Sequence, residues 1–231
     1  MTTIKTCTTP VEFQRVIYTI LPFTKQLKSE HELTVVLGKL VNSQWEQGVT
    51  EHFFESTLQT LLLYPGWSGV TDWTDVHTYL YTLNAKEVTT SLHITDTSVY
   101  TTHIDASVAE QQCVRIQAKP YDARVTLKHI VEVPRDALPT TVMPHHVEVK
   151  KYKTFMLDNW KYTFSMVWSG VTRLEAESMQ ENGDITYVIE IALLNNETYV
   201  KSHTPTYLAT SLLMKVASLF DTTLPIMYIE K

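Results

Sequence analysis

The chain has 231 residues, of which 44% are apolar, so it can bury a substantial core and is not expected to be disordered. Thr, Val and Tyr are abundant and Gly occurs only 6 times, a composition that favours strands over helices. The net charge of −6 excludes a global basic footprint for nucleic acid, so any RNA binding must depend on a local basic interior.

Nothing in the sequence points to secretion or to a membrane. The two cysteines, Cys7 and Cys113, are too few for a disulfide framework and suit a reducing compartment. No apolar run approaches ~20 residues, and the N-terminus lacks a signal-peptide pattern. We therefore expect an intracellular protein, in the cytoplasm or nucleus of a host or in a virion, with no membrane partner.

Three amphipathic helices are predicted along the chain. The first spans residues 10–23, where apolar side chains recur at helical spacing between two prolines. The second spans residues 51–63 and has Thr50 as its N-cap. The third spans residues 205–220 and has Pro205 at its first helical position. The apolar stripe of each helix is expected to pack against the outside of a barrel.

Most of the remaining chain alternates in the manner of strands. After a first strand at residues 32–41, the candidate strands are 74–82, 87–94, 97–104, 111–119, 124–133, 146–155, 160–171 and 184–194. With the first strand this gives about nine, enough to close a barrel. We therefore predict an α+β, mostly β fold. It is a single domain over residues 1–231, a closed antiparallel β-barrel (tunnel) of about eight to nine strands with flanking helices.

Two stretches indicate how the barrel wall is built. Residues 32–38 read Glu-Leu-Thr-Val-Val-Leu-Gly, and residues 187–194 read Tyr-Val-Ile-Glu-Ile-Ala-Leu-Leu. Because successive strand side chains point to opposite faces, one face of each stretch is apolar. The opposite face carries a single carboxylate, Glu32 or Glu190, and suits the lining of an interior.

These stretches resemble the first and last metal-binding strands of the tunnel-type, metal-dependent RNA 5′-triphosphatases of fungal, protozoan and large-DNA-virus mRNA capping systems. In that family the first strand reads Glu-x-Glu, apolar, basic, apolar, Gly, and the last reads Tyr followed by Glu-x-Glu-x-Glu. The residues that fit these patterns are Glu32, Leu37, Gly38, Tyr187 and Glu190. The residues that replace a family glutamate or basic residue are Thr34, Val36, Val188 and Ala192.

Further segments resemble the family in the same order along the chain. They are Gly48-Val49-Thr50 before a helix, Val114-Arg115-Ile116, Leu127-Lys128-His129, Lys151-Tyr152-Lys153-Thr154-Phe155, and residues 160–167. In the last segment, Thr163 and Ser165 replace the Asp and Thr of the family's Asp-x-Thr-x-Val strand. The resemblance covers most of the chain and implies the family's tunnel fold.

The resemblance and the strand alternation together imply which side chains line the tunnel. The expected phosphate-binding residues are Arg115, Lys128, Lys151 and Lys153. The other expected lining residues are Thr34, Lys161, Thr163 and Ser165. Set against Glu32, Glu132 and Glu190, these side chains give an excess of positive charge. Such an interior would attract an RNA 5′ end or a polyphosphate through charge-assisted hydrogen bonds.

The family hydrolyses triphosphates with Mg²⁺ or Mn²⁺ held by acidic side chains. In this chain only Glu32 and Glu190 remain as expected metal ligands, and no glutamate of the alternating pattern is left to orient an attacking water. We therefore expect the hydrolytic activity to be lost or very low and no cofactor to be needed, whereas an active chain would need Mg²⁺ or Mn²⁺.

Three functions remain open from the sequence alone. The first is a degenerate tunnel protein that serves as a binding or scaffold subunit in a capping, transcription or virion assembly, with a protein partner or as a homo-oligomer. The second is an active triphosphatase that removes the γ-phosphate of nascent mRNA with carboxylates from Glu132, Glu175 or Glu177. The third is a structural virion or assembly component that shares only the fold, its interior Lys and Glu forming ion pairs.

Overall fold

The computed structural model describes residues 10–83, 86–94, 99–116, 119–132, 143–194 and 197–220. The helices are α1 (Pro10–Lys25), α2 (Glu51–Leu62), α3 (Arg173–Asn182), α4 (Glu197–Ser202) and α5 (Pro205–Phe220). The strands are β1 (His31–Val41), β2 (Gln44–Gln47), β3 (Gly69–Val70), β4 (Thr74–Leu83), β5 (Lys86–Ile94), β6 (Val99–Val114), β7 (Asp122–Glu132), β8 (His146–Leu157), β9 (Trp160–Gly170) and β10 (Thr186–Leu193).

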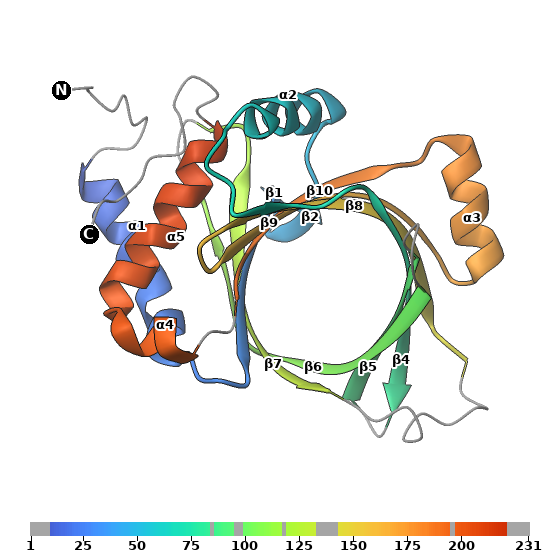
Figure 1. The fold of residues 1–231 in the computed structure, drawn as a ribbon, viewed down its shortest axis with the longest axis horizontal. Coiled ribbons are helices and arrows are strands. Elements are labelled where there is room, and N and C mark those ends of the chain that lie inside the picture. The colour runs from blue at the N-terminus through green and yellow to red at the C-terminus, as the bar shows by residue number, and fades with distance from the viewer. Residues whose placement is uncertain are drawn as a thin grey trace.

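The long strands form a ring of antiparallel pairs. Following the pairing, β10, β9, β8, β4, β5, β6, β7 and β1 lie side by side, and β1 also pairs with β10. This last pairing joins the two ends of the path, so eight strands surround a central space (Figure 1). The predicted mostly β tunnel is confirmed, and the strand number lies within the predicted range.

The main core lies between the outer face of the wall and the helices. Alternation places Leu33, Phe164 and Ile191 on that face, where they are fully buried together with Leu208 and Leu212 of α5. Helices α1 and α5 pack side by side on one flank of the barrel, and α3 covers β8 and β9 on another (Figure 1). The apolar face of each wall strand therefore points outward, and the opposite face is left for the interior.

The three predicted helices are present close to their predicted bounds. Helix α1 continues to Lys25, two residues past the predicted end, and Pro22 lies inside it and does not end it. The Thr50 hydroxyl caps α2 by accepting a hydrogen bond from the Phe53 amide at 3.4 Å. Helices α3 and α4 were not predicted. Helix α3 carries the signals of a short helix, since Thr172 caps its start and Gly183 ends it in the left-handed conformation. None of the described helices is both long and apolar enough to cross a bilayer.

One prediction about the strands is wrong. The sequence predicted separate strands at residues 97–104 and 111–119, whereas a single strand, β6, runs without a break from Val99 to Val114. The register of β6 against β7 shifts between Val108 and Glu110. An irregularity of this kind inserts an extra residue and reverses the alternation, which makes one long strand read as two short ones. Residues 97–98 and 117–118 lie outside the described part of the chain.

Candidate anion-binding tunnel

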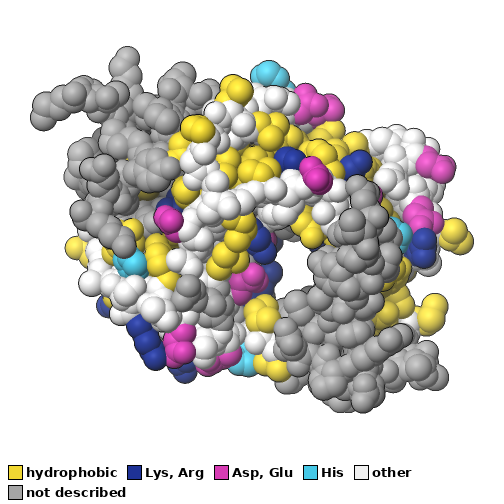
Figure 2. Space-filling view, in the orientation of Figure 1, with side chains coloured by type: hydrophobic (Ala, Val, Ile, Leu, Met, Phe, Trp, Pro, Cys, Tyr) yellow, Lys and Arg dark blue, Asp and Glu magenta, His cyan; other side chains and the backbone are white. Residues whose placement is uncertain are grey.

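The barrel encloses a cavity of about 440 Å³. Its described lining comes from seven wall strands and from Gln47 of β2, and most of these lining side chains are polar or charged. The charged members are Arg124, Lys128, Lys150, Lys161, Glu148 and Glu190. Figure 2 shows the opening at the centre of the molecule, with basic and acidic side chains on its wall. The tunnel therefore has a charged interior, as the sequence predicted.

One part of the lining is apolar. Val36, Val167 and Val188 form a small buried cluster on the tunnel side of β1, β9 and β10. Val36 lies opposite Glu190 on one side and Arg124 on the other. Val36 and Val188, which the sequence analysis aligned with a basic residue and a glutamate of the resembled family, thus pack against one another, and their side chains supply no oxygen ligand.

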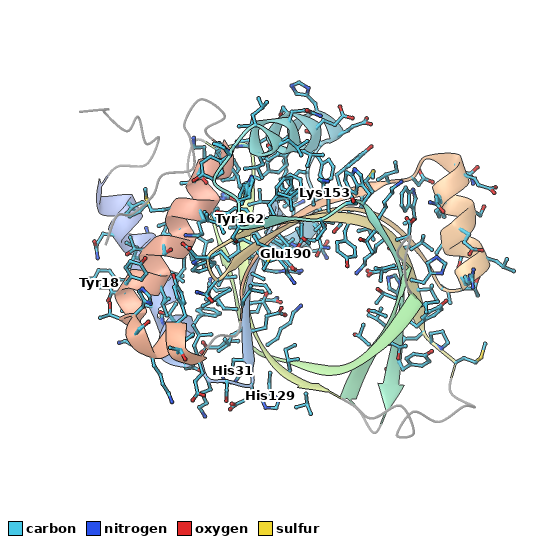
Figure 3. The ribbon with its side chains drawn as sticks, in the orientation of Figure 1. Tyr18, His31, His129, Lys153, Tyr162 and Glu190 are labelled. Atoms are coloured by element: carbon cyan, nitrogen blue, oxygen red, sulfur yellow. The ribbon has the colours of Figure 1, made fainter. Side chains whose placement is uncertain are left out.

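Glu32 and Glu190 lie on the same side of the wall, and the charge of Glu190 acts on Glu32. Burial raises the pKa of Glu32, and the charge of Glu190 raises it further. Lys161 and Lys128 oppose the rise in this pKa, and Lys128 lies directly opposite Glu32 in the strand register. Two carboxylates and two ammonium groups therefore share the interior, and they are close enough for their charges to interact. Figure 3 shows Glu190 on the inner side of the wall.

Arg124 is a tunnel residue that the sequence analysis missed. Its Nη2 donates a hydrogen bond to the Gln47 Oε1 at 2.9 Å, and its guanidinium lies over the Trp45 ring at 5.1 Å from the centroid. Its Nε is buried without a hydrogen-bond partner among the described residues. Burial lowers the pKa of Arg124. Arg124 could have been predicted, because it shares the strand parity of Lys128.

Lys150 and Glu148 form a separate ion pair on β8. The Lys150 Nζ lies 2.5 Å from the Glu148 Oε2, and the His146 Nε2 lies 3.5 Å from the other carboxylate oxygen. Burial would raise the pKa of Glu148, but Lys150 and His146 outweigh burial and leave this pKa below its usual value. Glu148 therefore compensates the charge of Lys150. Of the lining cations that the structure describes, Arg124, Lys128 and Lys161 remain to face Glu32 and Glu190.

The prediction that Lys151 and Lys153 line the tunnel is wrong. On β8 the cavity is lined by Glu148, Lys150, Tyr152 and Thr154, so the alternate residues Lys151 and Lys153 point outward. The Lys153 Nζ donates a hydrogen bond to the Thr71 carbonyl oxygen at 2.7 Å outside the wall (Figure 3). Both faces of this strand carry lysine, so a basic residue alone could not identify the inner face.

The prediction for Arg115 is also wrong. Arg115 follows the end of β6, its side chain is 71% exposed, and its Nη2 donates to the Leu40 carbonyl oxygen at 3.2 Å. It does not line the tunnel among the described residues. The strand ends at Val114, so the alternation assumed for Arg115 does not apply.

The other predicted lining residues lie on the tunnel side. Lys128, Lys161, Thr163 and Ser165 all line the cavity. Thr34 is 2% exposed and lies on β1 between the inward-facing Glu32 and Val36. In the strand register it is opposite Thr126 of β7 and Ala192 of β10. Whether any of them binds phosphate stays a prediction.

The alternative carboxylates do not reach the tunnel where the structure describes them. Glu175 and Glu177 lie on α3, outside the barrel. Glu175 accepts a hydrogen bond from the Val171 amide at 2.8 Å, and Glu177 pairs with Arg173 at 2.7 Å. The side chain of Glu132 lies outside the described residues.

The described side chains do not fit a metal centre of the kind the fold implies. Within the described ranges, no three His, Cys, Asp or Glu side chains come together as a metal site. Glu32 and Glu190 supply at most two protein ligands, and their charges interact with Lys161, Lys128 and Arg124. A hard divalent cation prefers an octahedron of oxygen ligands, and the neighbouring valines cannot contribute any.

No protein-family model matches the sequence, and no curated protein sequence matches it significantly. Solved structures do match. The Pct1 RNA triphosphatase of S. pombe superimposes with a TM-score of 0.66 at 10% identity, over 94% of each chain. The same enzyme in complex with the Spt5 CTD gives a TM-score of 0.66 at 12% identity, over 94% of this chain and 96% of that one.

A viral enzyme domain matches as well. The triphosphatase of the Mimivirus capping enzyme gives a TM-score of 0.61 at 9% identity, over 93% of this chain and 99% of that one. Together with the strand ring and the charged interior, these similarities show that the chain has the tunnel fold of the RNA triphosphatases of capping systems.

Proposed function

We propose that this chain is an RNA triphosphatase-like tunnel protein of an mRNA capping or transcription system, which binds a 5′-triphosphate or polyphosphate end without hydrolysing it. One observation carries the proposal: the interior keeps Arg124, Lys128 and Lys161, while valines occupy wall positions next to them. The fold itself supports the kind of system but not the chemistry.

The charge balance of the interior favours an anion. Lys150 is matched by Glu148, so among the side chains that the structure describes three cations face the two carboxylates Glu32 and Glu190. The raised pKa of Glu32 makes this carboxyl easier to neutralise than an ordinary one, and an anion that binds next to it would favour the protonated form. Inside a cavity of low dielectric, a polyphosphate would form strong charge-assisted hydrogen bonds with the remaining cations.

The same residues argue against hydrolysis. Phosphoryl transfer needs metal ions to neutralise the developing charge and a group to orient the attacking water. Val36, Val188 and Ala192 lack the oxygen atoms that either task requires. Glu190 interacts with the charge of Arg124 and lies opposite Thr163, one inward-facing position along β9 from Lys161, and in this setting its role is to balance charge.

Binding is tested by the thermal stability of the protein in tripolyphosphate. We expect the melting temperature to rise with ligand concentration and the rise to shrink with salt. Lys161→Met should reduce the stabilisation, and Lys201→Met, an exposed change on α4, should not. Stabilisation that is absent in the unmodified protein, or equal in both variants, would mean that the interior charges only pair with one another.

Hydrolysis is tested by phosphate release from triphosphate-ended RNA with Mn²⁺. We expect no release above that of a Glu190→Gln variant. Metal-dependent release that disappears in this variant would instead identify an active triphosphatase and contradict the non-hydrolytic part of the proposal.

We also propose that the chain acts with a protein partner. Pct1 of S. pombe, which has the same fold, forms a complex with the Spt5 CTD. A subunit that binds an RNA end without hydrolysing it would need a partner that acts on this end. The molar mass of the purified chain, measured by light scattering, would distinguish a homo-oligomer from a monomer whose partner is a different protein.

A further inference from the structure

A second hollow, of about 330 Å³, lies beside one end of the barrel. We call it the rim groove. Its basic lining residues are Lys39 on β1, Arg115 after the end of β6, and Lys119 before β7. Its floor includes Leu40 and Tyr121. Three cations thus surround one hollow on a chain whose net charge is −6.

The carboxylate in the rim groove is already engaged. Asp122 accepts hydrogen bonds from the Leu40 amide at 3.0 Å and from the Ile116 amide at 3.4 Å, and its Oδ1 lies 3.8 Å from the Arg115 Nε. Its main role is to hold the end of β1 and the segment after β6 around the groove. It compensates Arg115 in part and forms no ion pair with either lysine within 4.0 Å.

Lys39 and Lys119 have no carboxylate within 4.0 Å in the part of the chain that the structure describes. Glu46 lies opposite Lys39 in the strand register but outside that distance. The Lys39 Nζ lies 5.5 Å from the centroid of the Tyr121 ring, and the Lys119 Nζ lies 5.8 Å from that of Phe220. Aromatic rings hold both ammonium groups in place without neutralising them.

The rim groove lies at the same end of the barrel as Arg124. Asp122 begins β7 two residues before Arg124, and Gln47, which binds Arg124, pairs with Gly38 next to Lys39. Lys39 lies three residues, about 10 Å, beyond Val36 along β1. It has the parity of the outward-facing Leu37, so the rim groove lies on the outer face of the wall, next to its edge. A chain that leaves the tunnel at this end and bends over the edge of the wall would reach the rim groove within a few nucleotides.

We propose that the rim groove binds the phosphodiester backbone of the nucleotides that follow an RNA 5′ end, which rests on the proposed function of the tunnel. Lys39 and Lys119 would each neutralise a phosphate and release a condensed counterion. An acidic peptide could use the same charges, but the position of the groove next to Arg124 favours the ligand whose first phosphates the tunnel would hold.

The proposal is tested with three probes: tripolyphosphate, a single-stranded RNA of twelve nucleotides with a 5′-triphosphate, and a polyglutamate peptide. Affinities are measured by fluorescence anisotropy, or by competition for tripolyphosphate, over a series of salt concentrations. The test variant is Lys39→Gln with Lys119→Gln. The matched control is Lys25→Gln with Lys28→Gln, exposed lysines near the start of β1 and so at the opposite end of that strand.

We expect the test variant to bind the RNA about tenfold more weakly at 0.1 M salt. The slope of log K against log salt concentration should become less steep by about 1.4, that is, ~0.7 for each lost phosphate contact. Its affinity for tripolyphosphate should not change, and the control variant should match the unmodified protein with all three probes. Equal melting temperatures of the two variants would show that the lysine changes leave the fold intact.

Other outcomes separate the two proposals. If tripolyphosphate binds but the test variant binds RNA as the unmodified protein does, the rim groove does not bind RNA and the tunnel proposal stands. If tripolyphosphate does not bind while RNA binding still depends on Lys39 and Lys119, the tunnel proposal fails and the groove binds RNA independently. If only polyglutamate loses affinity in the test variant, the groove is a site for acidic peptide and the RNA proposal is overturned.

Discussion

Lys215 shows how a single side chain sets the pH dependence of this fold. Its Nζ donates a hydrogen bond to the Ser211 Oγ at 2.9 Å and lies 4.9 Å from the centroid of the Trp160 ring, between α5 and the barrel wall. Burial lowers the pKa of Lys215 from 10.5 to about 8, and the charge of Asp158 only partly opposes this. The unfolded chain therefore holds this proton more tightly than the folded protein does. Stability should rise as the pH increases from about 8 to about 10.5.

Replacement of Lys215 by methionine tests this effect. At pH 7 the change removes the free-energy cost of a buried charge, but it also removes the contact with the Trp160 ring. We expect the free energy of unfolding to increase by about 1–3 kcal/mol. The gain should shrink between pH 8 and pH 10.5, and urea denaturation at both ends of this range measures it. A gain that is the same at all pH values, or that also appears in Lys201→Met, would contradict the account.

Glu32 provides a second residue-scale prediction with the opposite sign. Burial and Glu190 raise the pKa of its carboxyl, so the folded protein holds this proton more tightly than the unfolded chain. The stabilisation present below the unfolded pKa is lost as the pH rises through the folded pKa. The Glu32→Gln variant should therefore be more stable than the unmodified protein at pH 7, with a difference that disappears at acidic pH.

The same variant should bind tripolyphosphate more tightly, because the lysine charges would no longer be shared with Glu32. We expect roughly a three- to tenfold gain in affinity, that is, about 0.7–1.4 kcal/mol. Glu46→Gln, an exposed change on β2, is the control for the loss of one negative charge. An equal gain in the control would mean that net charge, and not the interior, determines the binding.

At the scale of single elements, the hairpin of β1 and β2 brings Gln47 to the tunnel and Trp45 against the guanidinium of Arg124. Asn42 and Ser43 make the two-residue turn with positive φ angles of 50° and 65°, the backbone shape that suits the twist of a hairpin. A Cβ on Gly38 would collide with the Glu46 carbonyl oxygen and with the Trp45 ring. The glycine therefore lets the indole lie close against β1 and under the guanidinium of Arg124.

The Gly38→Ala variant is expected to displace β2 from β1. We expect a loss of about 1–3 kcal/mol in the free energy of unfolding and weaker tripolyphosphate binding, because Arg124 would lose the contacts that orient it. Gly69→Ala is the matched control, since its added Cβ would meet nothing closer than 3.6 Å. Chemical denaturation and a binding titration of both variants measure the effects. A Gly38→Ala protein with unchanged stability and binding would show that the hairpin has no part in the site.

The elements that the sequence predicted well are those with a strong apolar period. The three longer helices and the strands of the wall show it, whereas β2 has four residues and α4 buries none. For β8 the sequence contains more information than the lysines suggest. Val147, Val149, Phe155 and Leu157 are buried on the outer side with the parity of Lys151 and Lys153. The apolar residues, and not the basic ones, identify the outer face.

At the scale of the whole molecule, the tunnel depends on pairings between strands far apart in the chain. β4 lies beside β8, and β1 lies between β7 and β10. Local patterns predicted the number of strands and a closed barrel but could not give this order, because the alternation of one strand contains no information about its neighbour. The pairings determine which cations meet: they bring Lys161 and Glu190 to the wall that also holds Arg124 and Lys128.

The most direct test is a crystal structure of the protein soaked with Mn²⁺ and tripolyphosphate. We expect an intact tripolyphosphate inside the barrel, in contact with Arg124, Lys128 and Lys161, and no metal ion held by Glu32 and Glu190. A barrel that stays free of the anion, or a Mn²⁺ ion on both glutamates beside a cleaved phosphate, would contradict the account.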